Sequence, residues 1–172
     1  MDVLQALTQR RSCKVYTGEC VDSDTLHKIL AAGMNAPSGM GKQSAKIVVL
    51  QAPEEIAALE RMNAAILGNP DLHPFYGAPT VCVVVANADV PTCVEDGSLV
   101  MGNLMNAAWS LGVGSCWIHR AREEFSTPEG QALLASWGIT GNYIGIGHCL
   151  LGFPAKPYAT PKPRKDDYLL LR

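Results

Sequence analysis

The sequence contains few charged residues and no long apolar run, and both absences limit what the protein can be. Only 17% of its 172 residues are charged, the formal net charge is −2, and 48% of the residues are apolar. A nearly neutral chain has no general attraction for nucleic acid or for an anionic membrane. No apolar run approaches the ~20 residues of a membrane-spanning helix, and no apolar signal segment precedes the first arginines. We therefore expect a cytoplasmic protein with neither nucleic acid nor a membrane as its partner.

Several chemical signatures are also missing. The six cysteines form no C-x-x-C pair and the four histidines lie far apart, so the sequence predicts free thiols and no metal site. There is no Walker A sequence and no Gly-x-Ser-x-Gly elbow, which argues against a P-loop nucleotidase and a serine hydrolase. The stretches 112–117 and 145–150 both lack the third glycine of a dinucleotide fingerprint, so no Rossmann site is expected.

Length and element order predict one α+β domain over residues 1–172. Apolar spacing, capping residues and proline positions predict helices at 3–9, from 22 or 23 to before 36, at 53–66 and 95–111, and after 126–129. Runs of β-branched and apolar residues predict strands at 46–50, 81–86, 115–118 and 143–151. The expected inner faces are Leu26, Ile29, Leu30 and Met34 on the second helix, and Ile56, Leu59, Met62 and Ile66 on the third. Because strands and helices do not strictly alternate, we expect a mixed sheet with helices packed on it.

Three segments carry further predictions. The run 81–86 is continuously apolar, which is typical of a central strand covered on both faces. Helix 95–111 has almost no polar face, so it is expected in the core or at a subunit interface. Together with the high apolar fraction, this helix indicates an oligomer. Four prolines after Phe153 exclude a helix there and predict an extended tail laid over another surface.

Basic residues gather in two clusters. Arg10, Arg11 and Lys14 lie near the start of the chain, and Lys156, Lys162, Arg164 and Lys165 lie near its end. Ser12 adds a hydroxyl donor to the first cluster, and prolines stiffen the second. A phosphate monoester binds where several such donors converge, each charge-assisted hydrogen bond contributing about 1.5–3 kcal/mol. The two clusters can therefore meet at one anion; the alternative is a solvated basic surface.

Four blocks of sequence, in order along nearly the whole chain, resemble the FMN-dependent nitroreductase family. They are Arg10-Arg-Ser-x-Lys14-x-Tyr16, Ala36-Pro-Ser-Gly-x-x-x-Gln43, the segment from Asp96-Gly to Trp117-Ile118, and Gly147 to Lys162-Pro-Arg164. The resemblance implies a compact member with a mixed, mainly antiparallel sheet flanked by helices and an extended C-terminal tail. It also implies a homodimer with two FMN molecules at a large helical interface.

The same resemblance implies a role for each matching residue. The FMN phosphate and ribityl chain would be held by Arg10, Arg11, Ser12, Lys162 and Arg164. Lys14 would lie near the pyrimidine edge of the ring, where a cation stabilises the negative charge of the reduced flavin, so it is the one candidate catalytic residue.

Two more groups of residues would complete the pocket. Pro37, Ser38, Gly39 and Gln43 would come from the partner subunit and close it. Trp117, Ile118 and His119 would run along the ring, where a backbone N–H faces flavin N5. The loop residues His73, Phe75 and Tyr76 either line the substrate side or pack their loop onto the sheet.

The resemblance implies an enzyme that transfers a hydride from NADH or NADPH through FMN to a small acceptor such as a nitroaromatic or a quinone. The chain departs from the family pattern at Gly41, where asparagine is frequent, and at Ser44-Ala45, where Pro-Trp is frequent. The pocket wall is therefore expected to be roomier or less polar. Three alternatives stay open: another flavin reaction such as dehydrogenation, dehalogenation or flavin breakdown, a non-turnover flavin-binding or redox-sensing module with Cys13 as its thiol, and an FMN-free structural relative.

Overall fold

A four-stranded sheet with the strand order β1-β2-β4-β3 forms the centre of the computed structural model, which describes residues 2–172. The strands are β1 (Ala45–Leu50), β2 (Thr80–Asn87), β3 (Gly114–Ile118) and β4 (Tyr143–Gly152). The helices are α1 (Val3–Gln9), α2 (Ser23–Met34), α3 (Pro53–Ile66), α4 (Cys93–Ser110), α5 (Ala121–Glu124) and α6 (Pro128–Ser136), with a short 3-10 turn at Gly39–Gly41. The strand pairs are antiparallel, and an isolated bridge between Ser12 and Ser115 is parallel. The α+β prediction is confirmed.

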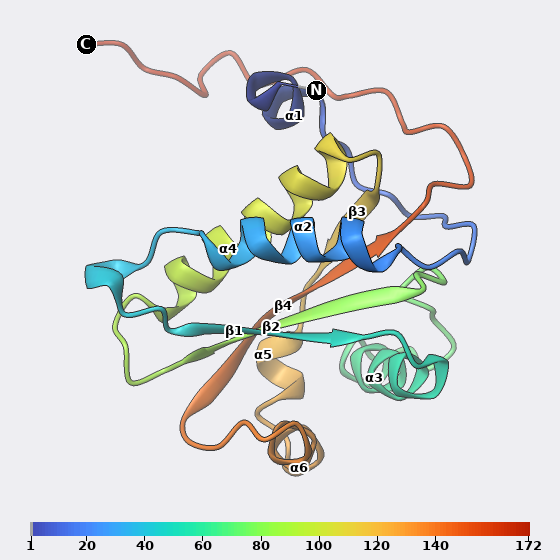
Figure 1. The fold of residues 1–172 in the computed structure, drawn as a ribbon, viewed down its shortest axis with the longest axis vertical. Helices are drawn as coiled ribbons and strands as arrows, with labels where there is room; N and C mark the ends of the chain where they lie inside the picture. The colour runs from blue at the N-terminus through green and yellow to red at the C-terminus, as the bar shows by residue number, and fades with distance from the viewer. Residues whose placement is uncertain (1) are drawn as a thin grey trace.

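Helices cover both faces of the sheet (Figure 1). Helices α2 and α4 lie on one face, and α3, α5 and α6 lie on the other. Side chains alternate along β2, so Val81, Val83 and Val85 enter the core beneath α3, while Cys82 and Val84 enter the core beneath α2 and α4. All five are fully buried. The prediction of a central strand covered on both faces is therefore confirmed.

The element boundaries follow local signals. The Asp22 side chain accepts a hydrogen bond from the Thr25 N–H at 2.9 Å and caps α2, as the sequence indicated. Helix α4 begins at Cys93, two residues before the predicted start. Helix α5 was not predicted, because four residues are too few to show a helical period. No helix within residues 2–172 is long and apolar enough to cross a membrane.

Two predicted inner faces need correction. On α2, Met34 is 72% exposed, although Leu26 and Ile29 are buried as expected. On α3, Ile56 and Leu59 are buried as expected, but Met62 and Ile66 are only half-buried, and the polar Asn63 is fully buried instead. Polar contacts hold Asn63 inward, and a hydropathy pattern contains no information about such contacts.

Helix α4 is not buried all round within the single chain. Its inner side chains Met101 and Leu104 are fully buried, but Leu99 is 46% exposed. Val3 and Leu4 of the neighbouring α1 are also exposed. The predicted core environment therefore holds for one side of α4, and the other side is exposed in the single chain.

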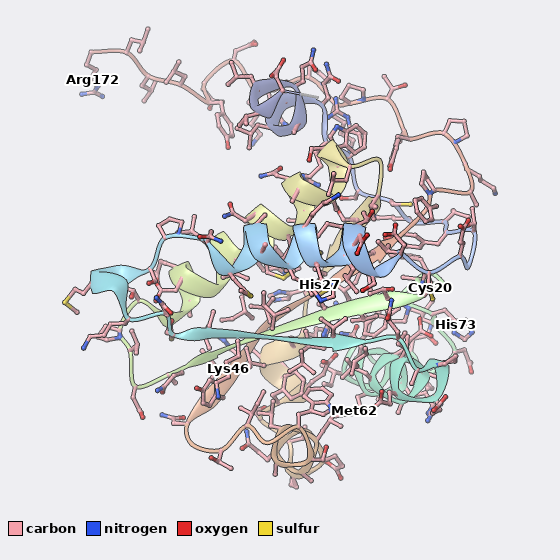
Figure 2. All side chains as sticks on the ribbon, in the orientation of Figure 1. Cys20, His27, Lys46, Met62, His73 and Arg172 are labelled. Carbon is pink, nitrogen blue, oxygen red and sulfur yellow. The ribbon has the colours of Figure 1, made fainter. Side chains whose placement is uncertain are left out.

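The first and last segments of the chain meet at the edge strand β3. The Cys13 N–H donates to the Ser115 carbonyl at 2.8 Å, which joins the first segment to β3. The Thr17 N–H donates to the Phe153 carbonyl at 3.0 Å, and a matching bond of 3.0 Å joins Ala155 to Val15. Beyond these bonds the tail continues without helix or strand, and Figure 2 shows Arg172 at its far end.

Asp96 anchors the loop between α2 and β1. Its carboxylate accepts hydrogen bonds from the Gly39 N–H at 2.9 Å, the Ser44 hydroxyl at 2.6 Å and the Thr92 hydroxyl at 3.2 Å. Burial alone would raise the pKa of Asp96, but the bonds from Ser44, Gly39 and Thr92 outweigh burial and lower this pKa below its ordinary value of 3.8. An ionised carboxylate therefore holds the loop.

We expect Asp96→Ala to lower the free energy of unfolding by about 3 kcal/mol at pH 7, because several charge-assisted hydrogen bonds are lost. The folded carboxyl binds a proton more weakly than the unfolded one, so protonation favours unfolding. The advantage of the wild type over the variant should be complete above pH 3.8 and shrink as the pH falls below that value. Urea unfolding of both proteins at pH 7 and pH 3 measures this difference in the free energy of unfolding. An equal difference at both pH values would contradict an ionised Asp96 as the anchor of the loop.

A second prediction concerns Gly145 of β4, beside the bulge where β4 changes register against β2. A Cβ at this position would lie 2.1 Å from the Ala121 carbonyl oxygen at the start of α5. Gly145→Ala should therefore destabilise the protein by about 3 kcal/mol or more, since backbone must move. Gly102→Ala is the control, because its added Cβ meets nothing within 4 Å. Equal urea midpoints for the two variants would show that α5 does not depend on this close approach.

Candidate functional site

The two basic clusters meet in a cavity of about 450 Å³ between the first segment and the tail. This tail cavity is lined by residues 11–15 and 156–162, including Arg11, Ser12, Lys14, Lys156 and Lys162. Of the five residues predicted to hold the phosphate and ribityl chain, Arg11, Ser12 and Lys162 line this cavity, together with Lys14 and Lys156 of the two basic clusters. Arg10 and Arg164 do not line it.

Backbone contacts fix the first segment of this cavity. The Arg11 guanidinium donates to the carbonyls of Thr8 and Arg10, at 3.3 and 2.8 Å, which ties it to the end of α1. On the tail, the Tyr158 ring packs against Trp109 of α4 with ring centroids 4.7 Å apart. The tail side of the cavity is therefore fastened to the helical layer.

A second cavity, of about 320 Å³, runs along β3 and is called the strand cavity here. Its lining includes Lys14, Trp117, Ile118, His119 and Arg120. Lys14 lines both the tail cavity and the strand cavity, so the two adjoin at this side chain. The predicted ring-side residues 117–119 and the predicted cation thus lie around one space.

The loop before β2 completes the strand cavity. His73 and Tyr76 line it, and the Lys14 ammonium lies 5.7 Å from the centroid of the Tyr76 ring. Figure 2 shows His73 beside α3, where its Nδ1 lies 3.4 Å from a Glu60 carboxylate oxygen. Phe75 has the other predicted role: it is buried and its ring packs on His148 at 5.3 Å. In this loop, His73 and Tyr76 therefore line the strand cavity, whereas Phe75 packs the loop onto the sheet.

A third cavity, of about 450 Å³, lies at the other end of the sheet and includes Pro37, Ser38 and Gln43 in its lining. It shares no lining residue with the tail cavity or the strand cavity. Gly39 is held just beside it by Asp96. Within one chain, this predicted group therefore stays apart from the other site residues.

A buried polar network lies behind the strand cavity, and sequence reasoning missed it. It consists of Asn63, Glu124 and His148, which are all fully buried, and the half-buried Arg120. The signal that could have found it is an asparagine on the inner stripe of α3, since a buried amide needs polar partners.

The cysteines are unpaired, as expected. All six are free thiols. Burial raises the pKa of Cys116 and, to about 12, that of Cys82. Cys13 is 3% exposed. Among residues 2–172 there is no group of three or more His, Cys, Asp or Glu side chains arranged to hold a metal ion.

Comparison with known proteins gives a consistent family. Residues 7–75 match the model of the nitroreductase family. A Methanothermobacter thermautotrophicus protein, provisionally named NADH dehydrogenase/NAD(P)H nitroreductase, is 31% identical over 147 residues, covering 75% of this chain and 71% of the relative. A protein of Archaeoglobus fulgidus with the same provisional name is 30% identical over 170 residues, covering 97% and 90% of the two chains.

The fold comparison agrees. The crystal structure of a nitroreductase from Bacteroides fragilis with bound FMN matches this structure with a TM-score of 0.91. The two sequences are 28% identical, and the match covers 100% of this chain and 99% of the other. On both sequence and structure, this chain belongs to the nitroreductase family.

Proposed function

We propose that this protein is an FMN-dependent oxidoreductase that uses NADH or NADPH to reduce a small acceptor such as a nitroaromatic or a quinone. The observation that carries the proposal is that the tail cavity, rich in cations, adjoins the strand cavity at Lys14. The bound FMN of the Bacteroides fragilis relative and the names of the archaeal relatives support it.

The donors of the tail cavity suit a phosphate monoester. Arg11, Lys156 and Lys162 supply positive charge, and Ser12 supplies a hydroxyl. Each charge-assisted hydrogen bond to phosphate contributes about 1.5–3 kcal/mol. The tail cavity would hold the phosphate and ribityl chain, and the strand cavity would hold the ring against residues 117–119. Arg10 and Arg164 remain predicted contacts from outside the cavity lining.

Lys14 stands where the two cavities meet, which suits a cation beside the pyrimidine edge of the ring. FMN bound here would supply the two-electron redox chemistry between NAD(P)H and the acceptor. A fixed ammonium at that edge stabilises the negative charge that reduction places there. Neighbouring Tyr76 lies under the ammonium and holds it in place.

We further propose that the protein works as a homodimer. The cavity that contains Pro37, Ser38 and Gln43 lies apart from the other cavities in one chain, which supports the prediction that a partner subunit contributes these residues to the flavin pocket. The exposed apolar side chains of α1 and α4 provide a surface for that partner. The predicted cytoplasmic location stays a prediction.

The redox-sensing alternative gains no support. Its proposed thiol, Cys13, is buried and donates to the Val15 carbonyl at 3.3 Å. A sensor cysteine needs access to solvent and a thiolate-favouring setting. In dehalogenation the organic substrate accepts electrons from the flavin, whereas in dehydrogenation it donates them, so NAD(P)H oxidation with a panel of acceptors separates these alternatives: a dehydrogenase would show no acceptor-dependent NAD(P)H oxidation.

The first test is the cofactor content. Purified wild type should show oxidised-flavin absorbance and release one FMN per chain, as identified by mass after denaturation. Arg11→Ala and Lys162→Ala should each weaken FMN binding about 10- to 100-fold, the equivalent of one charge-assisted hydrogen bond. Arg61→Ala, on the exposed side of α3 and outside these cavities, is the control. Wild-type FMN affinity in both cavity variants would show that the phosphate binds elsewhere.

The second test separates the role of Lys14 from binding. Lys14→Ala should still retain FMN, because other cations remain in the tail cavity, but its bound flavin should have a lower reduction potential. Lys14→Arg, which keeps the charge, should restore most of the difference. Redox titration against a reference dye measures it, and an unchanged potential in the alanine variant would remove the electrostatic role.

A further inference from the structure

The peptide that joins His119 to Arg120 ends the wall of the strand cavity and has an unusual backbone conformation. Arg120 has φ +78° and ψ 2°, in the left-handed region that favours glycine. For a residue with a side chain this conformation is unfavourable, because its Cβ lies too close to the following carbonyl oxygen. Because α5 begins at the next residue, the turn directs the chain from the strand cavity into the core. Such a turn persists only where surrounding contacts hold it.

Asn63 of α3 makes those contacts with both halves of the turn. Its Nδ2 donates to the His119 carbonyl at 2.9 Å, and its Oδ1 accepts from the Arg120 Nε at 3.0 Å. One buried amide therefore fixes the backbone of one residue and the side chain of the next. A leucine at position 63, which would continue the apolar side of α3, would make neither bond.

The amide is itself held from behind. Its Nδ2 also donates to one Glu124 carboxylate oxygen, and the other carboxylate oxygen bonds His148 Nε2. His148 Nδ1 is buried and has no hydrogen-bond partner. A proton on Nδ1 would be a buried donor without an acceptor, so Nε2 is the ring nitrogen that donates, to Glu124. The orientation of the Asn63 amide is thus determined from both sides.

The planarity of the His119–Arg120 peptide determines where its N–H points. In a trans peptide the carbonyl and the following N–H point in opposite directions. Since the His119 carbonyl points into the core toward Asn63, the Arg120 N–H points away from α3. Among residues 2–172, this N–H has no acceptor.

We propose that Asn63 is a positioning residue that sets the orientation of the His119–Arg120 peptide beside the flavin ring, with Glu124 and His148 fixing its amide. This inference rests on the proposed function for its effect on the flavin, whereas the clamp itself is independent of any ligand. Asn63 touches neither cofactor nor substrate, and it acts by holding the wall against which the ring is placed.

The test compares flavin binding with flavin reduction in Asn63→Ser, which removes both contacts to the turn. The FMN dissociation constant should stay within about threefold of wild type, because the phosphate cations are untouched. The rate of flavin reduction by NADH in a single turnover should fall about 10- to 100-fold, the effect expected from a displacement on the scale of an ångström. A reduction rate within twofold of wild type would overturn the proposal.

Gln131→Ala is the matched control. The Gln131 side-chain amide also donates to a backbone carbonyl, that of Phe125, at the other end of α5. It lines neither the tail cavity nor the strand cavity. Its loss should leave the reduction rate unchanged, so an equal fall in both variants would mean that α5 is simply loosened and would also overturn the proposal.

Two further measurements keep the result decisive. In FMN-free Asn63→Ser, the Glu124 amide, which donates to the Arg120 carbonyl at 2.9 Å, should exchange with solvent faster than in wild type. The exchange measurement tests the contacts of Asn63 even if wild type binds no FMN. A failure of wild type to bind FMN would instead contradict the proposed function. If Asn63→Ser does not fold, the side-chain amide protons of Asn63 in FMN-free wild type should exchange with solvent at least about 10-fold more slowly than those of the exposed Asn35, whose Nδ2 donates to the Ala31 carbonyl. Equally fast exchange of the two side-chain amides would overturn the proposal.

Discussion

Three backbone hydrogen bonds hold the first segment of this chain between the edge of the sheet and the tail, and the rest of the site depends on them. The bond from Cys13 to Ser115 adds the first segment to the edge of the sheet, and those linking Thr17 to Phe153 and Ala155 to Val15 add the tail to the first segment. Residues separated by most of the sequence thereby form one wall. Closing so long a loop costs little more entropy than closing a shorter one, since the cost grows only logarithmically with length.

The sheet provides the rigid reference for this wall. Strand β2 is buried on both faces, so its neighbours β1 and β4 are fixed by packing as well as by hydrogen bonds. Strand β3 lies at the edge, where one side pairs with β4 and the other receives the first segment through the bridge at Ser12. A site built on a sheet edge has a firm wall and an open side, which suits a ring that must meet two different substrates in turn.

The sequence was sufficient to predict the structure where a signal repeats along the chain or where a residue has an obligatory local role. Helix and strand positions followed from periodic apolar residues, from the Asp22 cap and from proline. The sequence also predicted that the basic clusters can meet, because the cations of both and the hydroxyl donor of the first suit one anion, and Arg11, Ser12 and Lys162 do line one cavity. The sequence did not predict which cations line the cavity, since the position of Arg164 depends on the path of a tail without regular structure.

Other features had no repeating signal. Helix α5 occupies a single turn, and the network behind the strand cavity joins residues from α3, α5 and β4 that no spacing connects. The separate cavity around Ser38 and Gln43 depends on a second copy of the chain for its proposed use, and intramolecular patterns contain no information about where that copy lies. Tertiary and quaternary contacts decide these parts of the site.

The cations of the tail cavity lack acidic partners. Within residues 2–172, no lysine or arginine lies within 4 Å of a carboxylate oxygen, and the two acid–base pairs present both involve histidine. Like charges held together without counter-ions raise the free energy of the folded chain, and a bound dianion removes that penalty. Folding and cofactor loading are then one linked equilibrium, in which ligand that binds only the native state increases its population. On the proposed function, the amount of folded protein in a cell would follow the flavin supply as well as the rate of synthesis.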